Sequence, residues 1–78
     1  MNSSKLLSPQ QTIIIQYLVN GSTVKEIAIL MNLATMTVRK YIGKAKKKLG
    51  AKTHDHVIAL AVARGEVSVS LDTTQTLF

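Results

Sequence analysis

The sequence predicts an all-α fold of four helices, and three observations lead to that prediction. Apolar residues recur at three- and four-residue spacing in four successive segments, a pattern typical of helices with a buried face. Residues that start or end helices separate these segments. Val67–Leu71 alternates apolar and polar residues, but no second strand is evident that would pair with it.

The first helix is expected over residues 9–20. Ser8 stands at the N-cap position, and Pro9 suits the first position of a helix. Gln11, three residues after Ser8, completes a capping box. Gly21 follows the last turn and is able to end the helix in the left-handed conformation.

The second helix is expected over residues 24–31. Thr23 and Glu26 have the spacing of another capping box. The apolar face is expected to consist of Ile27, Leu30 and Met31. Asn32 tolerates the left-handed region better than most residues, so a tight turn is expected there.

The third helix is expected over residues 35–49, and Gly50 ends it. One apolar stripe at helical spacing would face the core: Val38, Tyr41, Ile42, Ala45 and Leu49. The opposite face is basic, so this helix is strongly amphipathic.

The fourth helix is expected over residues 54–64. Thr53 or Asp55 would cap it, and Gly65 would stop it. The predicted organisation is therefore an N-terminal arm (1–6), one domain (7–65) and a flexible C-terminal tail rich in Ser and Thr (66–78).

Positive charge is concentrated in one segment of the chain. The sequence has ten Lys and Arg against four Asp and Glu, a formal net charge of +6. Seven of those ten cations lie within residues 39–52, and no acidic residue occurs between Glu26 and Asp55. Such a cluster indicates contact with nucleic acid. A solvated helix face and an anionic membrane surface are the alternatives.

Length and composition exclude several classes of protein. At 78 residues the chain has room for a single thin core. Without cysteine it has no disulfide framework and no thiolate metal site. The longest apolar run, Val57–Ala63, has seven residues, whereas a membrane span needs about 20. The N-terminus does not resemble a signal peptide, so we expect a cytoplasmic protein with no membrane partner.

No catalytic or cofactor-binding motif is present. The sequence lacks a Ser/His/Asp set, paired carboxylates and a glycine-rich phosphate loop, so we expect neither an enzyme nor a cofactor. His54 and His56 stand two residues apart, and on a helix that spacing points them to different sides. No metal site is expected from them.

A short turn joins the second and third predicted helices, and this pair forms a helix-turn-helix. The major groove of DNA admits one α-helix. In such motifs the second helix enters the groove while the first crosses the DNA backbone. Residues 24–31 would therefore position the motif, and residues 35–49 would read the bases.

Six short motifs also occur along the chain in a fixed order. They are Leu7-Ser8-Pro9, Gly21, Lys25-Glu26-Ile27-Ala28, Thr37-Val38, Lys48-Leu49-Gly50 and Val57-Ile58-Ala59-Leu60-Ala61. With this ordered set the segment from Leu7 to Gly65 resembles the LuxR/FixJ/NarL-type (GerE-like) helix-turn-helix domain. The resemblance covers about three quarters of the chain.

This resemblance implies a four-helix DNA-binding domain that dimerises on an inverted repeat through its fourth helix. It implies base-edge contacts from Arg39, Lys40 and Gly43, and Lys44 is a further candidate. Candidates for phosphate contacts are Thr23, Val24, Thr37, Lys44, Lys47, Lys48 and Lys52. Candidates for the dimer interface are Val57, Leu60, Ala61 and Arg64.

The sequence departs from the family pattern at four positions. Gln11 stands where the family usually has Glu, and Ala34 replaces the usual capping Ser, a loss of about 1 kcal/mol if nothing substitutes for the cap. Met36 stands where a polar or basic residue is common, and we interpret it as a filler of the turn. Gly43 has no side chain with which to bond a base. These departures affect the target sequence rather than the fold.

We therefore expect a bacterial-type transcription regulator that binds double-stranded DNA, as a homodimer, with RNA polymerase or another regulator as further candidate partners. The alternative is a protein-interaction module with the same fold, an antagonist that heterodimerises with another regulator through residues 54–64; the basic segment argues against it. Binding of an anionic membrane through residues 35–49 is a third hypothesis, weakened by the lack of Trp and Phe there. Whether the chain stands alone or belongs to a longer regulator stays open.

Overall fold

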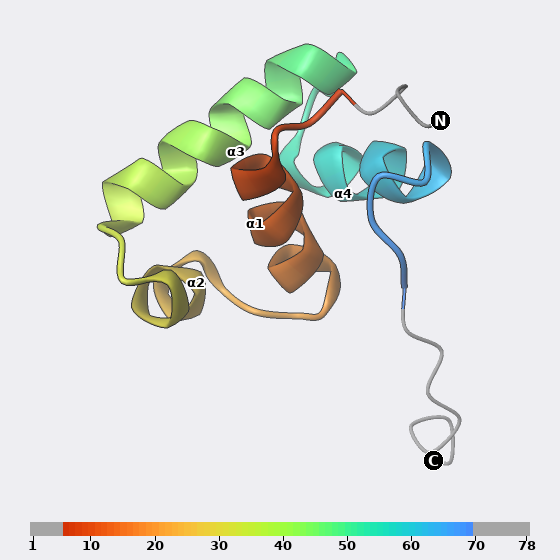
Figure 1. The fold of residues 1–78 in the computed structure, drawn as a ribbon. Coiled ribbons are helices and arrows are strands. Elements are labelled where there is room, and N and C mark those ends of the chain that lie inside the picture. The colour runs from red at the N-terminus through yellow and green to blue at the C-terminus, as the bar shows by residue number, and fades with distance from the viewer. Residues whose placement is uncertain (1–5, 70–78) are drawn as a thin grey trace, which may run out of the picture.

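The computed structural model describes residues 6–69, which form four α-helices and no strand (Figure 1). The helices are α1 (Pro9–Val19), α2 (Val24–Met31), α3 (Thr35–Leu49) and α4 (His54–Ala63). The predicted fold class is confirmed, and each helix lies within one residue of its expected bounds. The alternating stretch from Val67 is not a strand in the residues described, and residues 70–78 of the predicted tail lie outside them. None of the helices described is long and apolar enough to cross a membrane.

Both predicted capping boxes are present. The Ser8 hydroxyl accepts from the backbone N–H of Gln11 at 3.2 Å, and the Gln11 carbonyl oxygen Oε1 accepts from the Ser8 N–H at 2.9 Å. Thr23 and Glu26 make the same reciprocal pair at 3.1 and 2.8 Å. The first turns of α1 and α2 are thus fixed by local sequence.

The turn between α2 and α3 depends on Asn32. This residue adopts the left-handed conformation, with φ 55° and ψ 48°, as its type allows. Ala34 then takes the N-cap position of α3 and makes no side-chain hydrogen bond. No neighbouring side chain supplies the capping bond that the usual Ser would make. The start of α3 is held by backbone bonds from Thr37 and Val38 to the Ala34 carbonyl, at 3.0 and 3.1 Å.

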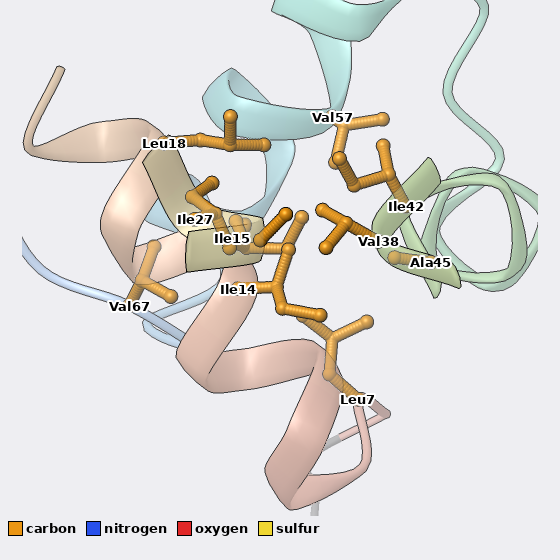
Figure 2. Packing of buried hydrophobic residues seen from close by; sticks show 12 residues of the cluster. Leu7, Ile14, Ile15, Leu18, Ile27, Val38, Ile42, Ala45, Val57 and Val67 are labelled. Carbon is orange, nitrogen blue, oxygen red and sulfur yellow. The ribbon is translucent and has the colours of Figure 1, made fainter. Parts of the chain in front are cut away.

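The core lies between the helices and receives a fully buried side chain from each of them (Figure 2). The largest are Ile14, Ile15, Ile27, Val38 and Val57. Burial of a side chain of this size contributes about 1.5–3 kcal/mol. Both α1 and α3 pack against all the other helices, whereas α2 and α4 do not contact each other. The core therefore fixes α3 from one side and leaves its other side open.

Two apolar side chains lie where the sequence did not place them. Leu30 was expected in the core, but it is exposed, and Ala28 takes the inward position on α2. Met36 was interpreted as a filler of the turn, yet 74% of it is exposed. It lies on the first turn of α3, away from the buried Val38.

The packed domain extends beyond residue 65, where the sequence placed its end. Glu66 and Val67 are both buried. The Glu66 carboxylate accepts from the backbone N–H groups of Leu6 at 2.9 Å and Leu7 at 3.4 Å. This carboxylate therefore joins the residues just before α1 to the residues just after α4.

A second pair of hydrogen bonds holds the residues that follow Val67. The Gln16 side-chain amide donates to the Ser68 carbonyl at 2.8 Å and accepts from the Ser68 N–H at 3.1 Å. The chain after α4 is thereby held against the middle of α1. Residues 66–68 thus belong to the fold rather than to a tail.

Candidate nucleic-acid interface

The outer face of α3 combines exposure with positive charge. One side of the helix is buried through Val38, Ile42 and Ala45. The exposed side chains and backbone on the other side form a continuous surface, which we call the reading face: Met36, Arg39, Lys40, Gly43, Lys44 and Lys47. In Figure 1 the other three helices lie on one side of α3, and no helix lies against its opposite side.

A hollow borders the reading face on the side of α2 and α4. It has a volume of about 270 Å³ and is lined by Val24, Arg39, Ile42, Gly43, Lys46 and His54. The packing of α3 against the core brings these residues together from three helices. The hollow is mostly apolar, but Arg39 and Lys46 place two cations at it, and each can bond an anion such as a phosphate.

A smaller hollow borders the other side of the reading face. It has a volume of about 150 Å³ and is lined by Thr37, Lys40, Tyr41 and Lys44. Three of the sequence-predicted contact residues, Thr37, Lys40 and Lys44, are therefore brought together. Hydroxyl and ammonium groups at one place can bond several oxygens of a phosphate backbone.

The three consecutive lysines point in different directions. Lys46 is half-buried and lines the larger hollow. Lys47 is exposed on the reading face. Lys48 donates from its ammonium to Oε1 of Gln11 at 3.1 Å, so it extends toward α1. Lys52 lies beyond α3 and is exposed.

The start of α2 presents a further set of donors. Thr23 accepts a capping bond with its hydroxyl oxygen, which leaves the hydroxyl hydrogen able to donate. Val24 is half-buried against the core, and its side chain lines the larger hollow. The N–H groups of the first helical turn have no partner within a helix, and they favour an anion.

The reading face keeps its charge free of internal neutralisation. The ion pair found among residues 6–69 joins Arg64 to Glu66, with Nε and Oε2 3.3 Å apart. No basic side chain of α3 is within ion-pair distance of a carboxylate in that part of the chain. The positive charges of α3 are therefore not neutralised by carboxylates in the described part of the chain.

The predicted dimer interface is wrong at two of its four positions. Val57 and Ala61 are fully buried in the core of a single chain and are not available to a second copy. Leu60 is half-buried, whereas Arg64 is exposed and paired with Glu66. The outward side of α4 instead presents Ala59 and Ala63.

Sequence reasoning missed His54 at this candidate interface, and it interpreted Met36 as a filler of the turn. His54 was considered only as a metal ligand, yet it lines the larger hollow with Arg39 and Lys46. The sequence signal that could have indicated this role was the position of His54 at the start of the fourth helix. The nearby His56 is occupied elsewhere, because its Nδ1 accepts from the Lys52 N–H at 3.0 Å. Within residues 6–69, no three His, Cys, Asp or Glu side chains gather in the manner of a metal site.

Comparison with known proteins identifies the family. A family model described as bacterial regulatory proteins, luxR family, matches residues 5–61. The probable HTH-type transcriptional regulator GfsR of Streptomyces halstedii is 40% identical over 55 residues, which cover 70% of this chain but 23% of that protein. The spore germination protein GerE of Bacillus subtilis (strain 168) is 31% identical over 67 residues, which cover 86% of this chain and 90% of GerE.

Solved structures give the same result. The structure of the transcription factor GerE superposes with a TM-score of 0.80 at 30% identity, covering 85% of this chain and 98% of that one. A complex of Vibrio cholera VqmA with a ligand and DNA gives a TM-score of 0.76 at 30% identity, covering 97% of this chain and 34% of VqmA. GfsR is described as a transcriptional regulator and GerE as a transcription factor. The match to GerE over nearly its whole length, together with the family model, shows that this chain belongs to the luxR family of bacterial regulatory proteins, which bind DNA through a helix-turn-helix.

Proposed function

We propose that this protein regulates transcription by placing α3 in the major groove of a specific DNA site. The observation that supports this most directly is the reading face, an exposed basic surface on one helix to which no carboxylate of residues 6–69 is paired. The major groove is wide enough for such a helix. The hollows on both sides of the face are bordered by donors suited to the two flanking phosphate backbones. Because bacterial DNA lies in the cytoplasm, we propose that the protein works there.

Within this arrangement the side chains divide into two roles. We assign base-edge contacts to Arg39 and Lys40, with Lys44 at the rim of the groove. Apart from its chain neighbours and the backbone of its own helix, Gly43 has no described atom within 4 Å of the place where a Cβ would stand, so the helix backbone can approach the bases there. Phosphate contacts are assigned to Thr23, Val24, Thr37, Lys44, Lys47 and Lys52. Lys48 is not in this set because its ammonium is bonded to Gln11.

We also propose that the protein binds as a homodimer on an inverted repeat. The support is the outward side of α4, where Ala59 and Ala63 are exposed beside the half-buried Leu60. Small side chains allow two helices to approach closely. A two-fold axis that passes through this surface would relate two chains and present their two α3 helices to two half-sites.

Selection of random duplex DNA by the purified protein tests this proposal. At near-physiological salt we expect enrichment of one inverted repeat whose half-sites are about one helical turn apart. A parallel selection with a variant in which Arg39, Lys40 and Lys47 are all alanine controls for non-specific capture. Enrichment of single half-sites would contradict the homodimer, and the same sequences from both proteins would contradict the role of the reading face.

Arg39→Ala and Lys47→Ala form a matched pair that separates base reading from phosphate contact. Arg39→Ala should lower affinity for the selected site by about 1–3 kcal/mol and relax the preference at one base pair. Lys47→Ala should weaken binding to the selected site and to unrelated duplexes alike. Fluorescence anisotropy on both kinds of duplex measures this, and equal losses from both variants on every duplex would show that Arg39 reads no base.

A further inference from the structure

Met36 is an apolar side chain in the middle of a basic surface. It is 74% exposed on the first turn of α3. Lys40, Gly43 and Lys47 follow it at intervals of four, three and four residues, and side chains at those spacings share one face of a helix. Met36 thus forms the N-terminal end of the central line of the reading face.

The fold leaves most of the Met36 side chain exposed. Burial of a methionine is favourable, yet the core accepts Val38 and Ile42 from α3 and leaves Met36 in water. A thioether is at most a weak hydrogen-bond acceptor. Met36 therefore cannot replace the donor that a polar or basic residue would supply here, and what it offers a ligand is apolar surface.

The position of Met36 determines which part of DNA it would meet. In helix-turn-helix motifs the N-terminal residues of the second helix contact the base edges. The edges in the major groove are polar except at thymine, which presents its C5-methyl group. About two turns further along, Gly43 has no side chain that would hold the helix away from the groove floor. Methionine is long and unbranched, so it can reach a methyl group there.

We propose that Met36 recognises a thymine in each half-site by packing against its C5-methyl group. This inference rests on the proposed function and adds to it a preference for one base that Arg39 and Lys40 do not supply. It also gives a physical reason for an exposed apolar residue among cations: the residue is buried when DNA binds.

Deoxyuridine substitution tests the contact because it removes the methyl group and leaves the hydrogen-bonding edge unchanged. The probe is the duplex enriched by selection, with each thymine of one half-site replaced in turn. We expect one position at which the loss of the methyl group weakens binding about fourfold, the value for one buried methyl. Met36→Ala should bind the parent duplex about fourfold or more weakly and show no further loss at that position.

Two controls accompany this experiment. Ile29→Ala removes an equally exposed apolar side chain, 78% exposed, from α2, and it should leave the deoxyuridine effect intact. Because Met36 is exposed, its replacement should leave the helical circular dichroism and the melting temperature unchanged. If Met36→Ala keeps the fourfold effect, or if no thymine matters to the wild-type protein, the contact does not exist even though DNA is bound. Failure of the wild-type protein to bind any duplex would overturn the proposed function and this inference together.

Discussion

Replacing Glu66 by alanine should lower the free energy of unfolding by about 2–4 kcal/mol, although this residue follows the last helix. The substitution removes the acceptor for the N–H groups of Leu6 and Leu7, of which the second is buried. A buried donor left without a partner costs about 1–3 kcal/mol. In a domain of this size the melting temperature should fall by roughly 10–20 °C. Urea titration and thermal melts followed by circular dichroism measure both quantities.

Glu26→Ala is the matched control for this experiment. Glu26 also accepts a hydrogen bond from a backbone N–H, that of Thr23 at 2.8 Å, but it is exposed. Water can replace the lost acceptor there, so the cost should be about 1 kcal/mol or less. A chain that ends at Gly65 should be destabilised at least as much as Glu66→Ala. If the two glutamate variants lose the same stability, burial of the Glu66 carboxylate is not what stabilises the fold.

The pH dependence of stability is a second readout of the same carboxylate. Burial by itself raises the pKa of Glu66, but the hydrogen bonds from Leu6 and Leu7 and the Arg64 guanidinium outweigh it, and the pKa lies below the ordinary value of about 4.5. The unfolded chain therefore binds this proton more readily than the folded one. The stabilisation is complete above about pH 4.5 and is lost as the pH falls through the folded-state pKa. Between about pH 5 and pH 3 the wild-type protein should lose stability more steeply than Glu66→Gln, and parallel curves would refute the assignment.

Raising the salt concentration from 50 to 200 mM should weaken DNA binding by about 10³-fold. Three lysines are assigned to phosphates in each chain, Lys44, Lys47 and Lys52. A homodimer would then neutralise about six phosphates and give a log–log slope of about −5. The same slope should appear with unrelated duplexes, because phosphate contacts carry no sequence information. A slope near zero would exclude this set of contacts.

Two adjacent lysines provide the control for the salt series. Lys47→Gln removes an exposed cation from the reading face, so the slope should become shallower by about 0.9 for each chain in the complex. Lys48→Gln removes a cation whose ammonium is bonded to Gln11, and the slope should stay unchanged. Both variants lower the net charge equally. If they change the slope by the same amount, overall charge rather than the position of Lys47 governs binding.

The helices could be predicted closely because their boundaries depend on neighbouring residues. The capping boxes at Ser8 and Thr23 and the left-handed Asn32 act over three or four residues, a range at which sequence spacing is informative. The basic stripe of α3 was equally readable, since its buried and exposed sides differ sharply in composition. Local signals therefore placed the central part of the candidate site as well.

The features that the sequence did not reveal depend on contacts between distant residues. Glu66 is separated from Leu6 by 60 positions, and nothing near it in the chain marks it as buried. In α4 the residues are apolar on several sides, so no stripe distinguishes Val57 and Ala61, which face the core, from the outward Ala59 and Ala63. The exposure of Met36 was not predicted either, because an apolar residue is usually expected to be buried.

The hydrogen bond between Leu6 and Glu66 also determines where a mechanical force would act on this fold. The Glu66 carboxylate joins the residues just before α1 to the residues just after α4, so all four helices lie between two points of the chain that are in contact. A force applied at Leu6 would therefore act first on the hydrogen bonds of Glu66, and a force applied at Val69 would act first on those between Ser68 and Gln16. Both sets of bonds would have to break before the force reached the helix-turn-helix.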